Sequence, residues 1–169
     1  MEGTMIEDKD LYRVALDTRN LEITLFWQRC NYFLVLNSAL ALGFFNLKAP
    51  EYSVLLAVVG LVTSGLWFAV SLGSKFWQSR WEYRLSQIEK QVAPGLNFFS
   101  ADLATVQRDV EDSIRFSEHF WARRWLDRLV LKKPSVSLMM TLLSLVFVAA
   151  WAAALGLFFF VPRVSDLGV

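Results

Sequence analysis

The chain has 169 residues, of which 55% are hydrophobic and 15% aromatic, and its mean hydropathy is +0.38. This composition is too apolar for an ordinary soluble domain, and the formal net charge of +1 argues against a nucleic-acid-binding protein. Three stretches lack Asp, Glu, Lys, Arg and His, and each is long enough to cross a hydrocarbon layer of about 30 Å, or nearly so. We therefore predict an all-α integral membrane protein with three transmembrane helices, at residues 30–47, 52–74 and 135–161. The remaining segments are too short for a self-sufficient catalytic domain.

Residues 1–29 are predicted to form a cytoplasmic helix that is continuous with the first span. Their many charged side chains are not typical of a secretory signal. Apolar or small residues recur here at every third or fourth position, as on a helix that packs against a partner. We call this pattern the first stripe, and it consists of Leu11, Val14, Thr18, Leu21 and Leu25.

The first two spans are predicted to form a hairpin, joined by an external turn at residues 48–51. Asn37 and Ser38 lie near the centre of the first span. An amide in hydrocarbon needs a partner, and an interhelical hydrogen bond of about 0.6–2 kcal/mol would satisfy it. Gly60 and Ser64 in the second span form a small-xxx-small pair, which allows two helices to approach closely.

Residues 75–134 are predicted to be a cytoplasmic helical region. The second span continues into it as a helix up to the pair Pro94-Gly95, and Ser100 is the expected N-cap of a further helix. The exit from the span carries a second stripe of apolar residues: Trp77, Trp81, Leu85, Ile88 and Val92. We expect the two stripes to pack in a cytoplasmic helical bundle, through Leu21, Leu25, Trp77, Trp81 and Ile88.

A basic and aromatic helix is predicted at residues 116–133, directly before the third span. Such a helix is typical of the lipid headgroup layer, where rings lie at the interface and cations meet anionic lipid. The residues expected to contact headgroups are Trp121, Arg123, Arg124, Trp125, Arg128, Lys132 and Lys133.

The third span precedes a short external tail at residues 162–169. It contains two further small-xxx-small pairs, Ala149 with Ala153 and Ala152 with Gly156. All of the small pairs either close the three-helix bundle of one chain or form contacts between subunits, and the sequence leaves both alternatives open.

Lys and Arg are unevenly distributed, and their distribution predicts the orientation. Residues 1–29 and 75–133 together hold all of the 17 except Lys48 and Arg163. The N-terminus and the middle region are therefore expected in the cytoplasm and the C-terminus outside, in a multi-pass membrane protein.

We expect neither an enzyme nor a cofactor or metal site. The chain has one histidine, His119, and one cysteine, Cys30, so it offers no plausible zinc-ligand set, and nothing in it supports a catalytic triad. Cys30 is expected to pack as a small apolar residue. The spans carry no ionisable side chain, which argues against an ion-coupled transporter.

Residues 11–92 resemble a known family. The residues that carry the resemblance are the run from Arg29 to Leu40 with its two asparagines, then Gly65-Leu66-Trp67, Ser79-Arg80-Trp81 and Ile88-Glu89-Lys90-Gln91. They are similar to the RipA-type family of small bacterial cytoplasmic-membrane proteins. The resemblance implies a self-assembling homo-octamer without known catalytic residues. The hairpin also looks like the two-span effector modules of bacterial conflict systems, although the third span departs from that pattern.

The leading interpretation is a homo-oligomeric inner-membrane scaffold whose partners are its own copies and anionic lipid. One alternative is an oligomeric channel or pore gated by the cytoplasmic helices, with polar residues of the spans facing the lumen: Asn37, Ser38, Thr63 and Ser64. Another alternative is an accessory membrane subunit that docks an unidentified protein through residues 116–133.

Overall fold

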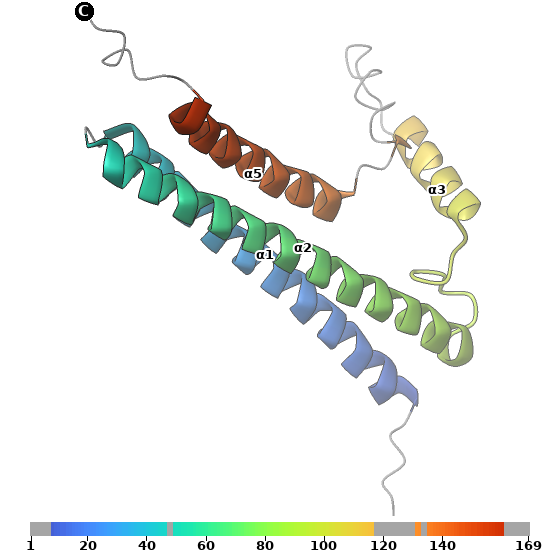
Figure 1. Cartoon of the computed structure of the whole chain (residues 1–169). Helices are drawn as coiled ribbons and strands as arrows, with labels where there is room; N and C mark the ends of the chain where they lie inside the picture. The colour runs from blue at the N-terminus through green and yellow to red at the C-terminus, as the bar shows by residue number, and fades with distance from the viewer. Residues whose placement is uncertain (1–7, 47–48, 117–130, 133–134, 161–169) are drawn as a thin grey trace, which may run out of the picture. The chain divides into compact units, whose positions relative to one another are not determined.

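The computed structural model describes residues 8–46, 49–116, 131–132 and 135–160. Its long helices are α1 (Asp8–Asn46), α2 (Pro50–Val92), α3 (Leu103–Phe116) and α5 (Val136–Phe160), shown in Figure 1. These ranges contain no β-strand, so the prediction of an all-helical fold is confirmed for the described part of the chain.

The first two helices are much longer than a bilayer is thick. α1 has 39 residues and α2 has 43, and neither is interrupted. At 1.5 Å per residue they measure about 58 and 64 Å, against a hydrocarbon layer of about 30 Å. A large part of each helix must therefore lie outside the lipid. α2 begins at Pro50, a residue suited to a first helical turn because its missing N–H is not needed there.

Within the described residues, two helices are long and apolar enough to cross a membrane, and they correspond to Glu51–Val92 and Val136–Phe159. α1 does not reach the same hydropathy, because its apolar section carries Asn31, Asn37 and Asn46. Apolar helices long enough to cross a membrane are therefore present at the second and third predicted spans, and the first span, in α1, remains a prediction.

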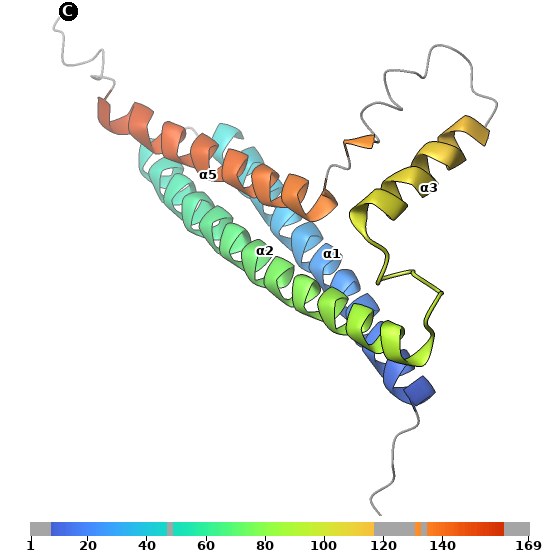
Figure 2. The same ribbon diagram turned by 90° about the vertical axis from the view of Figure 1, so that its right-hand side faces the viewer.

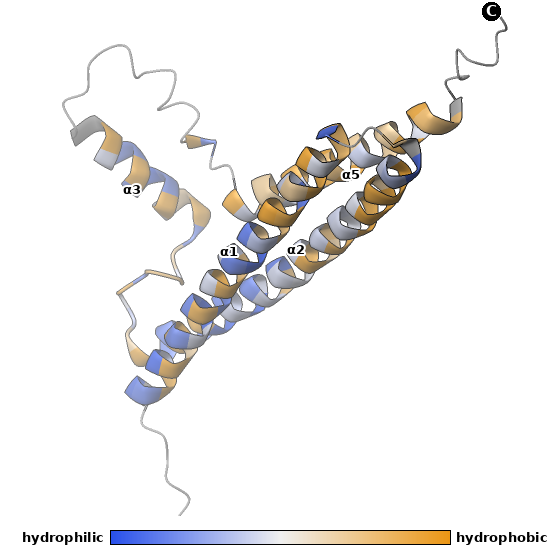
Figure 3. Ribbon diagram, turned by 90° about the vertical axis from the view of Figure 1, so that its left-hand side faces the viewer, coloured by the Kyte–Doolittle hydropathy of each residue, from blue (hydrophilic) through white to orange (hydrophobic). Residues whose placement is uncertain are grey.

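The chain divides into two compact units. The polar unit consists of Met1–Ile23 and Phe76–Val136, and the apolar unit consists of Thr24–Lys75 and Ser137–Val169. Figure 3 shows the difference, because α5 and the adjoining halves of α1 and α2 are mostly hydrophobic, whereas the other halves of α1 and α2 carry many hydrophilic residues. In the apolar unit α5 lies along α1 and α2, as Figures 1 and 2 show.

A seam of buried residues follows α2 from Ser53 to Gln78 at alternating spacings of four and three. This is the spacing at which helices pack as a left-handed coiled coil. In the apolar unit most of its members are small, which allows close approach of the helices. They are Ser53, Ala57, Gly60, Ser64, Trp67, Ser71 and Ser74, and in the polar unit Gln78, Leu85 and Glu89 are buried next.

The centre of the apolar unit is aromatic. Phe26, Cys30 and Trp67 are buried together. Phe33 stacks nearly parallel to Trp67, with ring centroids 6.2 Å apart, and Phe147 of α5 lies 5.8 Å from Trp67. All three helices thus contribute to one core, and Cys30 packs in it as a small apolar residue.

The expected N-cap of the third helix is wrong by two residues. α3 begins at Leu103, and its cap is Asp102, whose carboxylate accepts a hydrogen bond from the Thr105 backbone N–H at 2.9 Å. The Thr105 hydroxyl and N–H also hold the pKa of Asp102 below its ordinary value. Ser100 is not the cap, because the helix begins three residues after it, at Leu103.

Candidate helix-contact and assembly sites

Asn37 of α1 is fully buried and joins the three helices of the apolar unit. Its side-chain oxygen accepts a hydrogen bond from the Ser64 hydroxyl of α2 at 2.7 Å, and a second from the Trp151 indole N–H of α5 at 3.0 Å. Its side-chain N–H group donates to the Phe33 carbonyl oxygen in its own helix at 2.9 Å. Because an unpaired amide is costly in hydrocarbon, these bonds fix the relative register of the helices.

Gly60 makes room for the indole that reaches Asn37. Trp151 is buried, and a Cβ atom added at Gly60 would overlap its ring. Phe44 lies edge-on to the same ring, with centroids 5.7 Å apart. Glycine is therefore required for close approach at this point. The pair formed by Gly60 and Ser64 makes its contacts within one chain.

The polar residues of the first two spans do not form an accessible row. Asn37, Thr63 and Ser64 are buried within a single chain. Ser38 is exposed, but its hydroxyl donates to the Leu34 carbonyl oxygen in its own helix at 2.8 Å. A polar lumen lined by these four residues would need a different arrangement of the helices, which weighs against the channel alternative.

The two small pairs of α5 lie on a different side from its packed face. Ala149, Ala152 and Ala153 are exposed, and a Cβ atom at Gly156 would meet nothing within 4 Å. At 3.6 residues per turn, Ala149 and Gly156 lie about 140–160° around the helix from the buried Trp151. In the described structure these pairs are therefore not buried against the other helices of the chain, and a contact with another subunit stays a prediction.

Glu89, near the end of α2, holds the loop that follows it. Its carboxylate accepts backbone N–H bonds from Phe98 at 3.0 Å and from Phe99 and Ser100 at 2.8 Å each. Asn97, with φ at +53°, turns the chain so that these consecutive N–H groups point toward one anion. The loop is thus fastened to the buried face of the helix from which it emerges.

The Glu89 carboxylate is charged at neutral pH. Burial raises the pKa of this group, but hydrogen bonds from the Phe99 N–H, the Ser100 hydroxyl and the other loop amides lower it by more, to below the ordinary 4.5. Burial and the negative charge of Glu89 raise the pKa of the Tyr12 hydroxyl above its ordinary 10.0. Tyr12 therefore stays neutral beside a fixed negative charge.

The first stripe is largely free within one chain. Val14 is 60% exposed and Leu21 is 57% exposed, while Thr18 and Leu25 are half-buried. The residue of α1 that is buried in the polar unit is Ala15, about 120° around the helix from Leu21. The apolar side of α1 and the side that packs within the chain are thus different.

The second stripe is offset from the seam in the polar unit. Trp77 is 44% exposed, and its ring lies 5.4 Å from the Arg80 guanidinium. Trp81 and Ile88 are half-buried, and Leu85 is fully buried. Packing within the chain therefore accounts for only part of this stripe.

A comparison with protein-family models identifies one that matches. The model of the octameric membrane protein family covers residues 9–161. The chain belongs to the octameric membrane protein family. The resemblance noted in the sequence therefore holds at this level, and the match extends it through the third apolar helix. Comparisons of the chain with curated proteins and with solved structures gave no match.

The name of the octameric membrane protein family states that its members self-associate, so the surfaces that could join copies are the relevant sites. In the part of the chain that the structure describes, no cluster of three or more His, Cys, Asp and Glu side chains could hold a metal ion.

Most of the predicted headgroup helix lies outside the described residues, including Trp121, Arg123, Arg124, Trp125, Arg128 and Lys133. Lys132 is described, and it is exposed.

Two residues that shape this member of the octameric family are missed by sequence reasoning. In the sequence Trp151 resembles any aromatic residue of a membrane helix. Only Gly60, which has no side chain, suggests that a large side chain packs opposite it. Glu89 lies near the charged end of a helix, where a glutamate side chain is usually exposed to water, so its burial is not expected from the sequence. Its signal is the following turn, with Pro94 and Gly95, which brings the chain back toward the helix.

Proposed function

We propose that the chain is a non-enzymatic scaffold subunit that assembles with its own copies in the bacterial inner membrane. Contacts between copies form through the water-side halves of α1 and α2. The observation that carries this proposal is the first stripe, because Val14 and Leu21 remain more than half exposed in the polar unit. Leucine and valine that recur at helical spacing outside lipid gain stability only when another helix covers them.

The proposed topology has three spans, with the polar unit in the cytoplasm. α1 is included as a span because Asn37 is hydrogen-bonded to Ser64, which lies within the apolar part of α2. Its asparagines lower its hydropathy, but Asn37 makes three hydrogen bonds and so adds little cost in lipid. The Lys and Arg distribution supports a cytoplasmic N-terminus.

A photo-crosslinking side chain placed at position 21 tests the contact directly. With benzoylphenylalanine in place of Leu21, irradiation of native membranes is expected to give a ladder of covalently joined copies, because a neighbouring copy covers this position. Peptide mapping of the product then identifies the contacting residue in the other copy.

Position 20 is the matched control. Asn20 is also exposed and adjacent in sequence, but it lies about 100° around the helix from Leu21. It is expected to give few joined copies. Equal ladders from both positions, or products at position 21 that contain only lipid or a different protein, would refute the proposed contact.

A further inference from the structure

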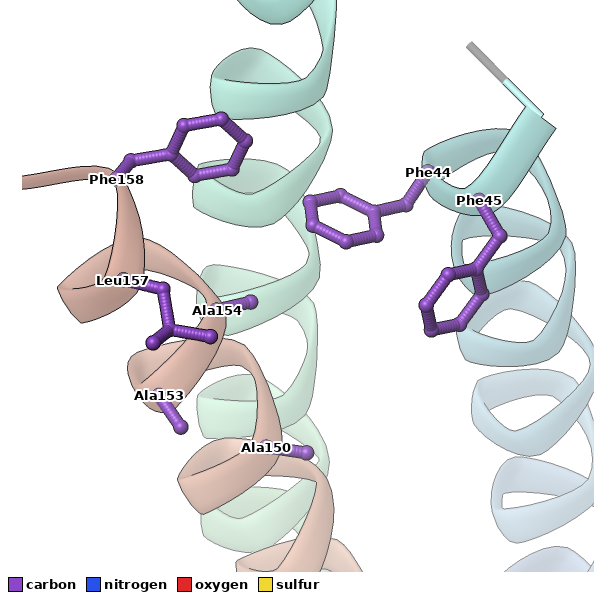
Figure 4. A pocket seen from close by; sticks show the side chains of 7 residues that line it. All are labelled: Phe44, Phe45, Ala150, Ala153, Ala154, Leu157 and Phe158. Carbon is purple, nitrogen blue, oxygen red and sulfur yellow. The ribbon is translucent and has the colours of Figure 1, made fainter. Parts of the chain in front are cut away.

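An apolar groove lies between the C-terminal ends of α1 and α5 in the apolar unit. It has a volume of about 580 Å³, and its walls include Phe44 and Phe45 of α1 and Ala150, Ala153 and Leu157 of α5. Figure 4 shows these side chains reaching into the space from the two helices. Phe158 of α5 points toward Phe44 across one end, with ring centroids 6.1 Å apart.

A smaller recess continues from the groove toward the interior. It has a volume of about 120 Å³, shares Phe44, Phe45 and Ala150 with the groove, and reaches Trp151. Trp151, one of its lining residues, is the residue whose indole is bonded to Asn37. The recess thus adjoins a residue that helps to fix the helices.

The chemistry of the lining selects an apolar occupant. Every side chain that lines the groove is Ala, Leu or Phe, so nothing in it could recognise a charged or polar ligand. The groove spans Ala150 to Phe158, which corresponds to about 12 Å along a helix, close to the 15 Å of one hydrocarbon leaflet. An extended hydrocarbon segment within one leaflet fits both properties.

We propose that this groove holds one acyl chain of a membrane phospholipid. The lipid lies in the leaflet that contains the turn between α1 and α2, and its chain runs along α5 toward Trp151. The occupant restores dispersion contacts that the facing rings and the alanine wall would otherwise lack. This proposal goes beyond the scaffold function, because it depends only on the apolar unit.

Size argues against a helix of a second copy in the same place. A helix with side chains is about 10–12 Å in diameter, so a 12 Å length of it occupies on the order of 1,000 Å³. The groove has a volume of about 580 Å³, and its recess is far smaller. A second copy can cover the groove but cannot enter it.

The proposal is tested by mapping lipid contacts in bilayer nanodiscs. The full chain is reconstituted with phosphatidylglycerol that carries a diazirine in the half of one acyl chain nearest the headgroup, irradiated and analysed by mass spectrometry. Adducts are expected on Phe44, Phe45 and Leu157, at about five times or more the yield on the exposed Leu55 and Val62 of α2, because a seated chain keeps its contacts longer.

Two variants separate a bound chain from general lipid contact. Ala153→Trp fills the groove and is expected to reduce the adducts on its walls to the level of α2. Ala149→Trp adds the same ring one turn away, outside the groove lining, and is expected to leave them unchanged. Any effect of a bulky residue on contacts between copies is common to both variants.

Two outcomes would overturn the proposal. One is an even spread of lipid adducts over all exposed apolar positions of the wild-type chain, which would show bulk lipid only. The other is an undiminished yield of adducts on Phe44, Phe45 and Leu157 in Ala153→Trp, which would show that these adducts do not come from a chain in the groove. Neither outcome depends on the contact at Leu21, so the proposed scaffold function is tested separately.

Discussion

Asn37→Leu is expected to lower the free energy of unfolding of the apolar unit by about 2–3 kcal/mol. Leucine has a similar volume but accepts no hydrogen bond, so the Trp151 indole N–H is left buried without its acceptor. Ser64 can turn to a carbonyl oxygen of its own helix, which limits the loss on that side. The value is large for a membrane protein because one oxygen serves two other helices.

Reversible unfolding in mixed micelles measures this change, and Ser38→Ala is the control. Ser38 is the next residue, is exposed, and bonds only within α1. Its loss is expected to cost at most about 0.5 kcal/mol. If Asn37→Leu were as mild as Ser38→Ala, the bonds to Ser64 and Trp151 would not be what holds the three helices in register.

Glu89→Gln is expected to free the loop that follows α2. A glutamine amide keeps one acceptor oxygen but presents N–H groups to backbone donors, so at least one of the three loop amides loses its partner. The loss of charge-assisted bonds is expected to cost about 2 kcal/mol, which corresponds to about 30-fold faster amide exchange at Phe98, Phe99 and Ser100. Hydrogen exchange with mass spectrometry measures the exchange rates of these three amides.

Glu82→Gln is the matched control for the loss of one negative charge from α2. Glu82 is partly exposed, and its ion pair with Arg19 is 3.6 Å long. An exposed pair of this kind is worth about 0–1 kcal/mol, so exchange in the loop should change little. Equal effects of the two substitutions would mean that general charge, and not the buried carboxylate, holds the loop.

The contact between the Glu89 carboxylate and the loop has a defined pH dependence. Because the pKa of folded Glu89 lies below the ordinary 4.5, ionisation favours the folded loop at every pH above that ordinary value. The stabilisation is therefore constant from neutral pH down to about 4.5, and it is lost as the pH falls through the lower folded pKa. Glu89→Gln should remove this acid sensitivity of loop exchange.

The long helices follow from the sequence because their signals are local. Pro50, the absence of charge along the spans and the three- and four-residue spacings each act within a few turns. The need of Asn37 for a partner is also readable from its position in lipid. That Trp151 is its partner cannot be predicted from the sequence, because Trp151 lies in a helix that is distant in sequence and contains several aromatic residues.

The side of each helix that packs within one chain is harder to predict than the helix itself. The first stripe marks the most apolar side of α1, but the chain packs through Ala15, where a small residue lets α2 approach. On α2, Gln78 is buried while its neighbour Trp77 is partly exposed. Hydrophobicity alone cannot assign these sides, because a residue that packs between copies and one that packs within a copy have the same pattern.

The contact of Leu21 with another copy is the central claim, and native mass spectrometry of detergent-solubilised protein tests it most directly. The wild-type chain and Asn20→Lys are both expected at the mass of eight 19.4-kDa chains. Leu21→Lys is expected as smaller species, because a charge would then be buried between helices. If Leu21→Lys kept the full mass and the wild-type resistance to dissociation, the first stripe would not join the copies.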